Sequence, residues 1–201
     1  MDVLERAAKL REEADLVMRS IGLEEILRPY GEITPTGSYF LDVMVYPDVD
    51  LYMPKVSVGQ LFEIGARLAD VSIVTRVVFE KSNVPNLPGG LFLQPRIHYG
   101  DWERPWKIDI WSLDASVIAE KMSQMRHFAD GMTPAVREQI LHYKFSLLND
   151  EQRTPSFSGY FIYKAFMDEG LSGFDQVTQY LIDNGINIET NRRKHVDSRL
   201  A

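Results

Sequence analysis

The segment Thr36-Gly37-Ser38-Tyr39-Phe40-Leu41-Asp42-Val43-Met44-Val45-Tyr46-Pro47-Asp48-Val49-Asp50-Leu51 places a glycine–serine pair upstream of two aspartates that alternate with apolar residues. Alternation of this kind is the period of a β-strand with one dry face, so Asp48 and Asp50 are expected to project side by side. Two adjacent carboxylates repel each other, and a divalent cation such as magnesium, which prefers oxygen ligands, relieves that repulsion. The segment therefore predicts a metal-binding strand.

A third aspartate stands in a second strand-like segment, Trp106-Lys107-Ile108-Asp109-Ile110-Trp111. By alternation, Asp109 faces opposite to Ile108 and Ile110. An acid inside so apolar a segment borders a site or lies at a wet sheet edge, because an isolated buried carboxylate is costly. If the two strands are neighbours, three carboxylates converge, which is enough to hold two magnesium ions.

The pair Gly37-Ser38 lies where a short strand, residues 33–36, is expected to give way to a helical turn. Glycine lets the backbone approach a phosphate closely, the free N–H groups of a helix start point at the phosphate, and the serine hydroxyl adds a donor. Alone, such a pair is more often a turn with a helix cap, and a lone Asp-x-Asp is common on exposed strands. Their combination at this spacing favours a triphosphate site.

Together, Gly37-Ser38, the Asp48-x-Asp50 strand and the later Asp109 resemble the signature of the polymerase-beta-type nucleotidyltransferase superfamily, which includes many uncharacterised bacterial proteins. The resemblance implies that Ser38 binds the triphosphate and that Asp48 and Asp50 ligate both metals. It also implies that Asp109 ligates the catalytic metal and helps to deprotonate the acceptor hydroxyl. The spacer before Asp48 lacks the Gly, Arg and Ser residues that many members have there, so no subfamily is assigned.

The resemblance covers residues 33–113 and implies a metal-dependent transferase that uses Mg²⁺ or Mn²⁺. The expected reaction moves a nucleoside monophosphate, AMP from ATP or the equivalent from another NTP, to a hydroxyl of a small molecule or protein. Two alternatives stay open: a nucleotide-binding regulatory module with the same fold and no transfer activity, and an RNA-directed nucleotidyltransferase. Family members tend to place a basic residue on the phosphates; the candidate is Lys144, with Arg76, Arg96 and Arg104 as competitors.

The composition excludes several classes of protein. Apolar residues make up 45% and charged residues 25% of the 201 residues, as in ordinary soluble domains. The absence of cysteine excludes disulfides and thiolate sites, and the four histidines form no zinc-protease motif. The net charge of -7 argues against a nucleic-acid acceptor, because binding a polyanion requires a basic surface. No apolar run approaches the ~20 residues of a membrane span, so a cytoplasmic protein without membrane contact is expected.

Hydrophobic periodicity predicts an α+β fold, with a mixed part of helices and strands followed by a helical C-terminal region. The resemblance implies that the first part is a nucleotidyltransferase core, a small mixed β-sheet flanked by helices. The expected division is a core with an N-terminal helix over residues 1–113 and a helical region over residues 114–201. Trp106 and Trp111 are expected to pack rather than to bind a base, and Phe62 is expected to face inward. The expected helices are residues 2–22, 57–69, a helix capped by Asp114, one capped by Thr133, 159–168, and 174–184 opened by a Ser172-x-x-Asp175 box. The expected strands are residues 33–36, 48–53, 73–79, 91–99 and 106–113.

Overall fold

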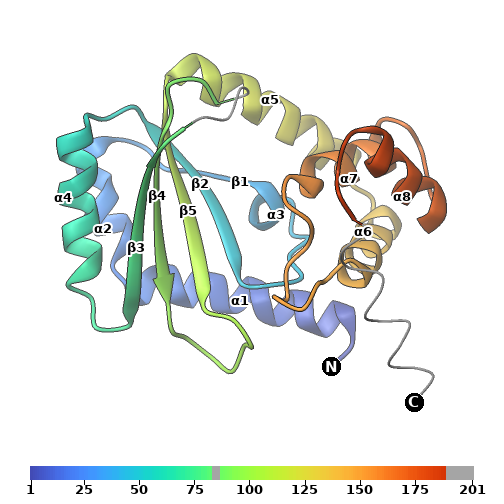
Figure 1. Cartoon of the computed structure of the whole chain (residues 1–201), viewed down its shortest axis with the longest axis horizontal. Helices are drawn as coiled ribbons and strands as arrows, with labels where there is room; N and C mark the ends of the chain where they lie inside the picture. The colour runs from blue at the N-terminus through green and yellow to red at the C-terminus, as the bar shows by residue number, and fades with distance from the viewer. Residues whose placement is uncertain (83–86, 189–201) are drawn as a thin grey trace.

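The computed structural model describes residues 1–82 and 87–188 and shows an α+β protein with one five-stranded sheet (Figure 1). The tip of the 81–90 loop and the basic tail at residues 192–199 lie outside the described residues. The elements in chain order are α1 (Val3–Ser20), α2 (Leu23–Leu27), the 3-10 helix η1 (Arg28–Tyr30), β1 (Thr34–Thr36), α3 (Gly37–Phe40), β2 (Asp48–Pro54), α4 (Val58–Ala69), β3 (Val74–Lys81), β4 (Leu91–Ile97), β5 (Trp106–Leu113), α5 (Ala115–Gly131), α6 (Pro134–Ser146), α7 (Ser158–Met167) and α8 (Phe174–Asp183).

The sheet is mixed, with strand order β1-β2-β5-β4-β3. Strands β2 and β5 are parallel, and the other neighbouring pairs are antiparallel. A parallel pair needs a long crossover connection, which here is the run through α4, β3 and β4. The predicted fold class is therefore confirmed, and the two strands that carry the aspartates lie side by side at the centre of the sheet.

One face of the sheet is covered by α1, α2 and α4, whose apolar residues share a single core with the strands. Alternation directs Val49 and Leu51 of β2 and Ile108 and Ile110 of β5 into this core. Trp106 is fully buried in the same cluster, so the packing role predicted for it is confirmed. The polar residues between them must project from the opposite face.

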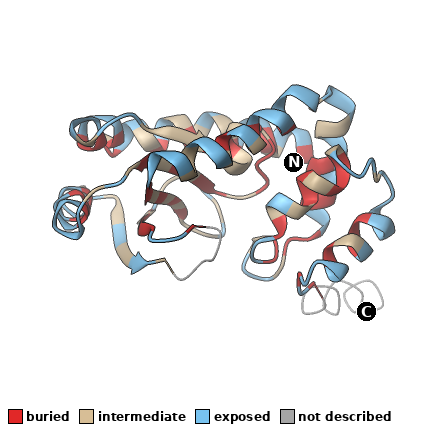
Figure 2. Cartoon of the chain, turned by 90° about the horizontal axis from the view of Figure 1, so that it is seen from above, coloured by how far each residue is buried: buried red, intermediate tan, exposed pale blue. Residues whose placement is uncertain are grey.

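The C-terminal helices form a second apolar core, beside β1 and α3 (Figures 1 and 2). Leu41, Val43 and Val45, which lie between the glycine–serine pair and Asp48, are buried in this second core rather than in the first. The segment that leads into the acidic strand is therefore fixed by contacts with the helical half of the chain.

Two of the helix N-caps predicted from the sequence are present in the structure. Ser57 forms a capping box with Gln60 at the start of α4, and the Thr133 hydroxyl accepts a hydrogen bond from the Val136 N–H at the start of α6. These caps satisfy N–H groups that have no partner inside the helix. Among the described residues, no helix has the length and apolar character to cross a bilayer.

Two predicted caps are wrong. Helix α8 begins after Gly173 with no side-chain cap, so the predicted Ser172-x-x-Asp175 box is not formed. Asp114 occupies the N-cap position of α5 but does not cap it, because its carboxylate pairs with Lys55 Nζ at 2.8 Å instead. In the second case, an ion pair replaces the bond to the backbone.

The inward position predicted for Phe62 is also wrong, because 56% of this residue is exposed. Leu61, Ile64 and Leu68 already form the buried stripe of α4, and Phe62 lies about 100° around the helix from Leu61. Its ring instead packs on Phe79 of β3, with centroids 4.8 Å apart. An apolar pair thus lies at the outer edge of the molecule.

Candidate active site

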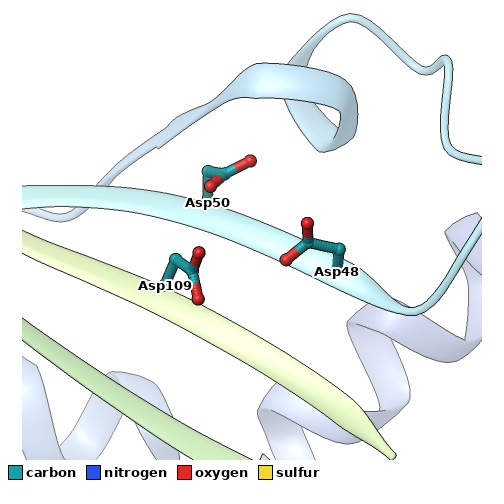
Figure 3. Close-up of side chains that lie close together, drawn as sticks. All are labelled: Asp48, Asp50 and Asp109. Atoms are coloured by element: carbon teal, nitrogen blue, oxygen red, sulfur yellow. The ribbon is translucent and has the colours of Figure 1, made fainter. Parts of the chain in front are cut away.

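The acidic patch is built by the register of β2 and β5. Asp48 is paired with Lys107, and Asp50 with Asp109. Because alternate residues of a strand share a face, all four side chains project from the face opposite the helix-covered core. Carboxylate oxygens of the three aspartates lie within 4.8 Å of one another (Figure 3). The structure brings the three predicted residues together; their role as metal ligands stays a prediction.

The glycine–serine turn lies directly against this patch. Gly37 opens α3 with a φ of +61°, and Thr36 before it pairs with Asp50 across β1 and β2. A Cβ atom built on Gly37 would lie 2.5 Å from Asp50 Oδ2, a distance that non-bonded atoms do not tolerate. Glycine is therefore required both by the left-handed backbone and by the approach of the carboxylate. Ser38, the next residue, is half-buried.

Lys107 is a residue of the candidate site that sequence reasoning missed. Its Nζ lies 2.9 Å from Asp48 Oδ1 and 2.7 Å from Asp109 Oδ2, so one ammonium bridges carboxylates on two strands. The signal was present in the sequence, because Lys107 precedes Asp109 by two residues and shares its face by alternation. Among the described residues, Lys107 is the basic residue that forms ion pairs with Asp48 and Asp109.

A short chain of hydrogen bonds fixes the orientation of Asp109. Gln94 on β4 donates from Nε2 to Asp109 Oδ1 at 2.7 Å, and Arg96 donates from Nε to Gln94 Oε1 at 3.2 Å. Arg96 also stands opposite Lys107 in the register of β4 and β5, and Arg76 stands opposite Arg96 on β3. A row of basic side chains therefore runs across the sheet beside the acids.

Arg104, another predicted competitor for the phosphate-binding role, lies near the same patch. Its guanidinium is 5.1 Å from the centroid of the Tyr46 ring, and its charge lowers the pKa of Asp48. Arg104 also donates to the carbonyl oxygens of Glu151 and Gln152 at 3.4 Å. It thus joins the acidic face to the loop between α6 and α7.

Burial is the main influence on how the acids ionise. Burial raises the pKa of Asp48 to about 6, although the charge of Lys107 lowers it and Asp109 raises it further. Burial, together with the charges of Asp48 and Asp109, holds the pKa of Asp50 well above its ordinary value. Burial lowers the pKa of Lys107, but the three carboxylates outweigh that effect and raise it. Both Asp48 and Asp50 are therefore easier to protonate than an ordinary aspartate.

The raised pKa of Asp48 predicts how metal-free stability depends on pH. The unfolded chain loses this proton near pH 4, whereas the folded state keeps it to about pH 6. The free energy of unfolding should therefore fall between these pH values, by on the order of 2 kcal/mol, and stay low above them. The expected result is a lower midpoint of urea unfolding at pH 7 than at pH 4.5 with a chelator present. In Asp48→Asn this loss should shrink, and an unchanged loss in that variant would contradict the assignment.

Lys144, the predicted phosphate ligand, is 3% exposed and donates from Nζ to the Val43 carbonyl at 2.6 Å and to the Tyr163 hydroxyl at 3.3 Å. Burial lowers its pKa to about 8, while Asp48 and Asp50 raise it. Its described bonds tie the segment before Asp48 to α6 and α7. A contact between Lys144 and phosphate stays a prediction.

Comparison with known proteins gives distant likenesses in structure alone. No protein-family model matches the chain, and a comparison with curated proteins found no match. Among solved structures, a cytoplasmic RNA terminal U-transferase aligns with a TM-score of 0.47 and 13% sequence identity, over 70% of this chain and 42% of that chain. The present chain thus spans less than half the length of that protein. A likeness of this size does not identify a reaction, so function is inferred from the side chains themselves.

Proposed function

We propose that this protein is a metal-dependent nucleotidyltransferase that moves a nucleoside monophosphate, with ATP as the expected donor, to a hydroxyl of a small molecule or a protein. The observation that carries the proposal is the convergence of Asp48, Asp50 and Asp109 within 4.8 Å, beside the turn at Gly37. Two neighbouring strands hold the acids there, in an arrangement that repulsion between carboxylates opposes and that a bound divalent cation would relieve.

The donor set fits a hard divalent cation. The three acids offer only oxygen, the ligand atom that Mg²⁺ and Mn²⁺ prefer. Asp48 Oδ1 is buried and has no hydrogen-bond donor aligned with it, although Lys107 Nζ is only 2.9 Å away. When bound, the cations would lower the pKa of the attacking hydroxyl and neutralise charge on the leaving pyrophosphate.

The residues of this chain would bind and orient the reactants. Gly37, without a side chain, lets the turn approach Asp50 closely, and Ser38 would offer a hydroxyl and an N–H group to phosphate oxygens. Asp109 would accept the proton of the acceptor hydroxyl, since Gln94 and Lys107 already fix the direction of its carboxylate. Holding the reacting groups in place is most of what a protein contributes to phosphoryl-type transfer.

The bridge made by Lys107 supports a second candidate function. Its ammonium already neutralises part of the charge on Asp48 and Asp109, as a cation would. A protein of this kind can bind a nucleotide without transferring it, as a regulatory module. The two functions differ in outcome: transfer releases pyrophosphate, and simple binding does not.

Substituting Lys107 tests whether it competes with a cation. Lys107→Met should lower the free energy of unfolding by about 3 kcal/mol in the absence of metal, because removal of one partner leaves two buried carboxylates uncompensated. The carboxylates are then free for a cation, so Mg²⁺ should raise the melting temperature more in this variant than in the wild type. Differential scanning calorimetry with and without Mg²⁺ measures both effects.

The matched control for this experiment is Lys55→Met, which breaks the exposed ion pair with Asp114. An exposed ion pair contributes about 1 kcal/mol or less to the free energy of unfolding. Because this pair involves none of the three acids, the effect of Mg²⁺ on the melting temperature should equal that in the wild type. If Lys107→Met responds to Mg²⁺ no more than this control does, Lys107 does not occupy a cation site.

A labelled-nucleotide assay tests the reaction. ATP labelled at the α-phosphate is incubated with Mg²⁺ and cell extract, with and without ribonuclease, and both pyrophosphate and labelled products are measured. The proposal expects Mg²⁺-dependent label in a product that resists ribonuclease. Label in a ribonuclease-sensitive product would favour the RNA-directed reaction instead, and nucleotide binding without pyrophosphate would favour the regulatory module. Absence of any nucleotide binding would overturn all three.

A further inference from the structure

Strand β3 is an open edge of the sheet. Among the described residues it pairs only with β4. It is eight residues long, and none of them is buried, although the sequence Val74-Thr75-Arg76-Val77-Val78-Phe79-Glu80-Lys81 contains three valines and a phenylalanine. An edge strand of this length offers a row of unpaired backbone groups to another strand. Proteins ordinarily protect such an edge with charged residues, proline or a β-bulge, and β3 carries three charged residues and a register shift between Val74 and Arg76. Because its charges have both signs, a second copy of the same strand can pair with them.

The side chains of β3 divide between the two faces of the sheet. Val77 lies next to Gly65 of α4, and Phe79 packs on Phe62 of the same helix, so Val77 and Phe79 belong to the helix-covered face. By alternation, Arg76, Val78 and Glu80 belong to the acidic face. The charges on that face have opposite signs and are spaced evenly around Val78.

We propose that two copies of this chain associate through antiparallel pairing of their β3 strands, about a two-fold axis at Val78. In this register each Arg76 faces Glu80 of the second copy, and each Val77 faces Phe79. Two five-stranded sheets then join into one continuous sheet, with α4 of both copies on the same face. This proposal does not depend on the proposed function.

Other registers of the same pairing are less favourable. An axis at Arg76 places two arginines directly opposite each other, and like charges in that position repel. An axis at Val77 sets Arg76 against Val78 and leaves Glu80 facing the irregular end of the strand, where the pairing with β4 shifts between Val74 and Arg76. An axis midway between two residues would place the helix-covered face of one copy on the same side of the joined sheet as the acidic face of the other. Only the axis at Val78 pairs both charges with their opposites.

The apolar residues at this edge also favour a second copy. Phe62 is 56% exposed and Val58, one turn earlier on α4, is 36% exposed. Phe62 packs on Phe79 of β3, and Val58 lies on the same helix. Pairing of the two edges would bring Phe62 of both copies closer together and reduce its exposure to water.

Charge reversal tests the register. Analytical ultracentrifugation of the full chain should show a dimer, and Arg76→Glu or Glu80→Arg alone should weaken it at least about tenfold, because each change occurs twice in a two-fold interface. The double variant Arg76→Glu with Glu80→Arg should restore dimerisation. Arg126→Glu, an exposed charge reversal on α5, is the control for net charge and should leave the dimer unchanged. A monomer at all concentrations, or single variants that dimerise like the control, would overturn the proposal.

A cysteine on the axis gives an independent test, because the chain contains no cysteine. In the proposed pairing the two copies of residue 78 lie about 5 Å apart between Cα atoms, within the range that a disulfide spans. Val78→Cys should therefore form a cross-linked dimer on mild oxidation with diamide. Glu80→Cys should not, since its two copies would be roughly 13 Å apart at 3.3 Å per residue. Equal cross-linking of the two variants would contradict the register.

Discussion

Asp50→Asn is expected to reduce nucleotidyl transfer about a thousandfold or more while leaving the metal-free protein at least as stable as the wild type. The amide keeps the shape of the side chain but removes the charge that binds a cation, and loss of several kcal/mol of metal-dependent stabilisation of the transition state corresponds to this factor. Stability should not fall, because burial and two neighbouring carboxylates already disfavour the charged form of Asp50, as its raised pKa shows. Pyrophosphate release and thermal unfolding in a chelator measure the two effects.

Asp42→Asn is the matched control for this prediction. Asp42 lies in the same segment, and its carboxylate is half exposed and pairs with Arg137 at 2.8 Å, away from the acidic patch. Its φ of +55° is a conformation that asparagine accepts. Activity in Asp42→Asn should equal that of the wild type. If Asp50→Asn were as active as this control, Asp50 would not be a metal ligand.

Gly37→Ala is expected to lower transfer about a hundredfold and to destabilise the protein by about 2 kcal/mol. The left-handed backbone at this position costs an alanine about 1 kcal/mol relative to glycine. In addition, the new methyl group would meet Asp50 Oδ2 at 2.5 Å and must displace that carboxylate or the turn itself. A shift of about 1 Å in a reacting group can cost a hundredfold in rate. Activity assays and chemical unfolding check the two expected losses.

Gly170→Ala separates the two contributions. Gly170 has a φ of +62°, almost the same as Gly37, but no atom lies within 4 Å of the position of an added Cβ. This variant should therefore show only the backbone cost of about 1 kcal/mol and retain full activity. Equal stability losses in the two variants, with activity retained in both, would mean that the turn does not constrain Asp50.

Alternation alone predicted most of what positions the acids. The strand at residues 106–113 and the inward residues of β2 follow directly from period-two patterns, which depend only on local geometry. Convergence of the acids depends on the parallel pairing of β2 with β5, which is a long-range contact. From the sequence, this pairing could only be assumed; in the structure the two strands are neighbours.

The parts that sequence could not predict are tertiary contacts. The pattern places Lys107 on the same face as Asp109, but its bridge to Asp48 exists only once β2 and β5 pair in this register. The helical pattern alone indicates a surface position for Lys144. In the structure, the segment before Asp48 buries it, and its Nζ donates to the Val43 carbonyl. Phe62 is predicted to face inward because it is apolar, but it lies about 100° around the helix from Leu61, and its contact with Phe79 is set by the tertiary structure.

The most direct test of the central claim is a titration of the purified protein with Mn²⁺, followed by the electron paramagnetic resonance signal of the free ion. The account predicts saturable binding to the wild type, tighter binding when ATP is present, and a large loss of affinity in Asp109→Asn. Absence of saturable binding in the wild type, or equal binding by Asp109→Asn, would contradict the claim that these three aspartates hold a divalent cation.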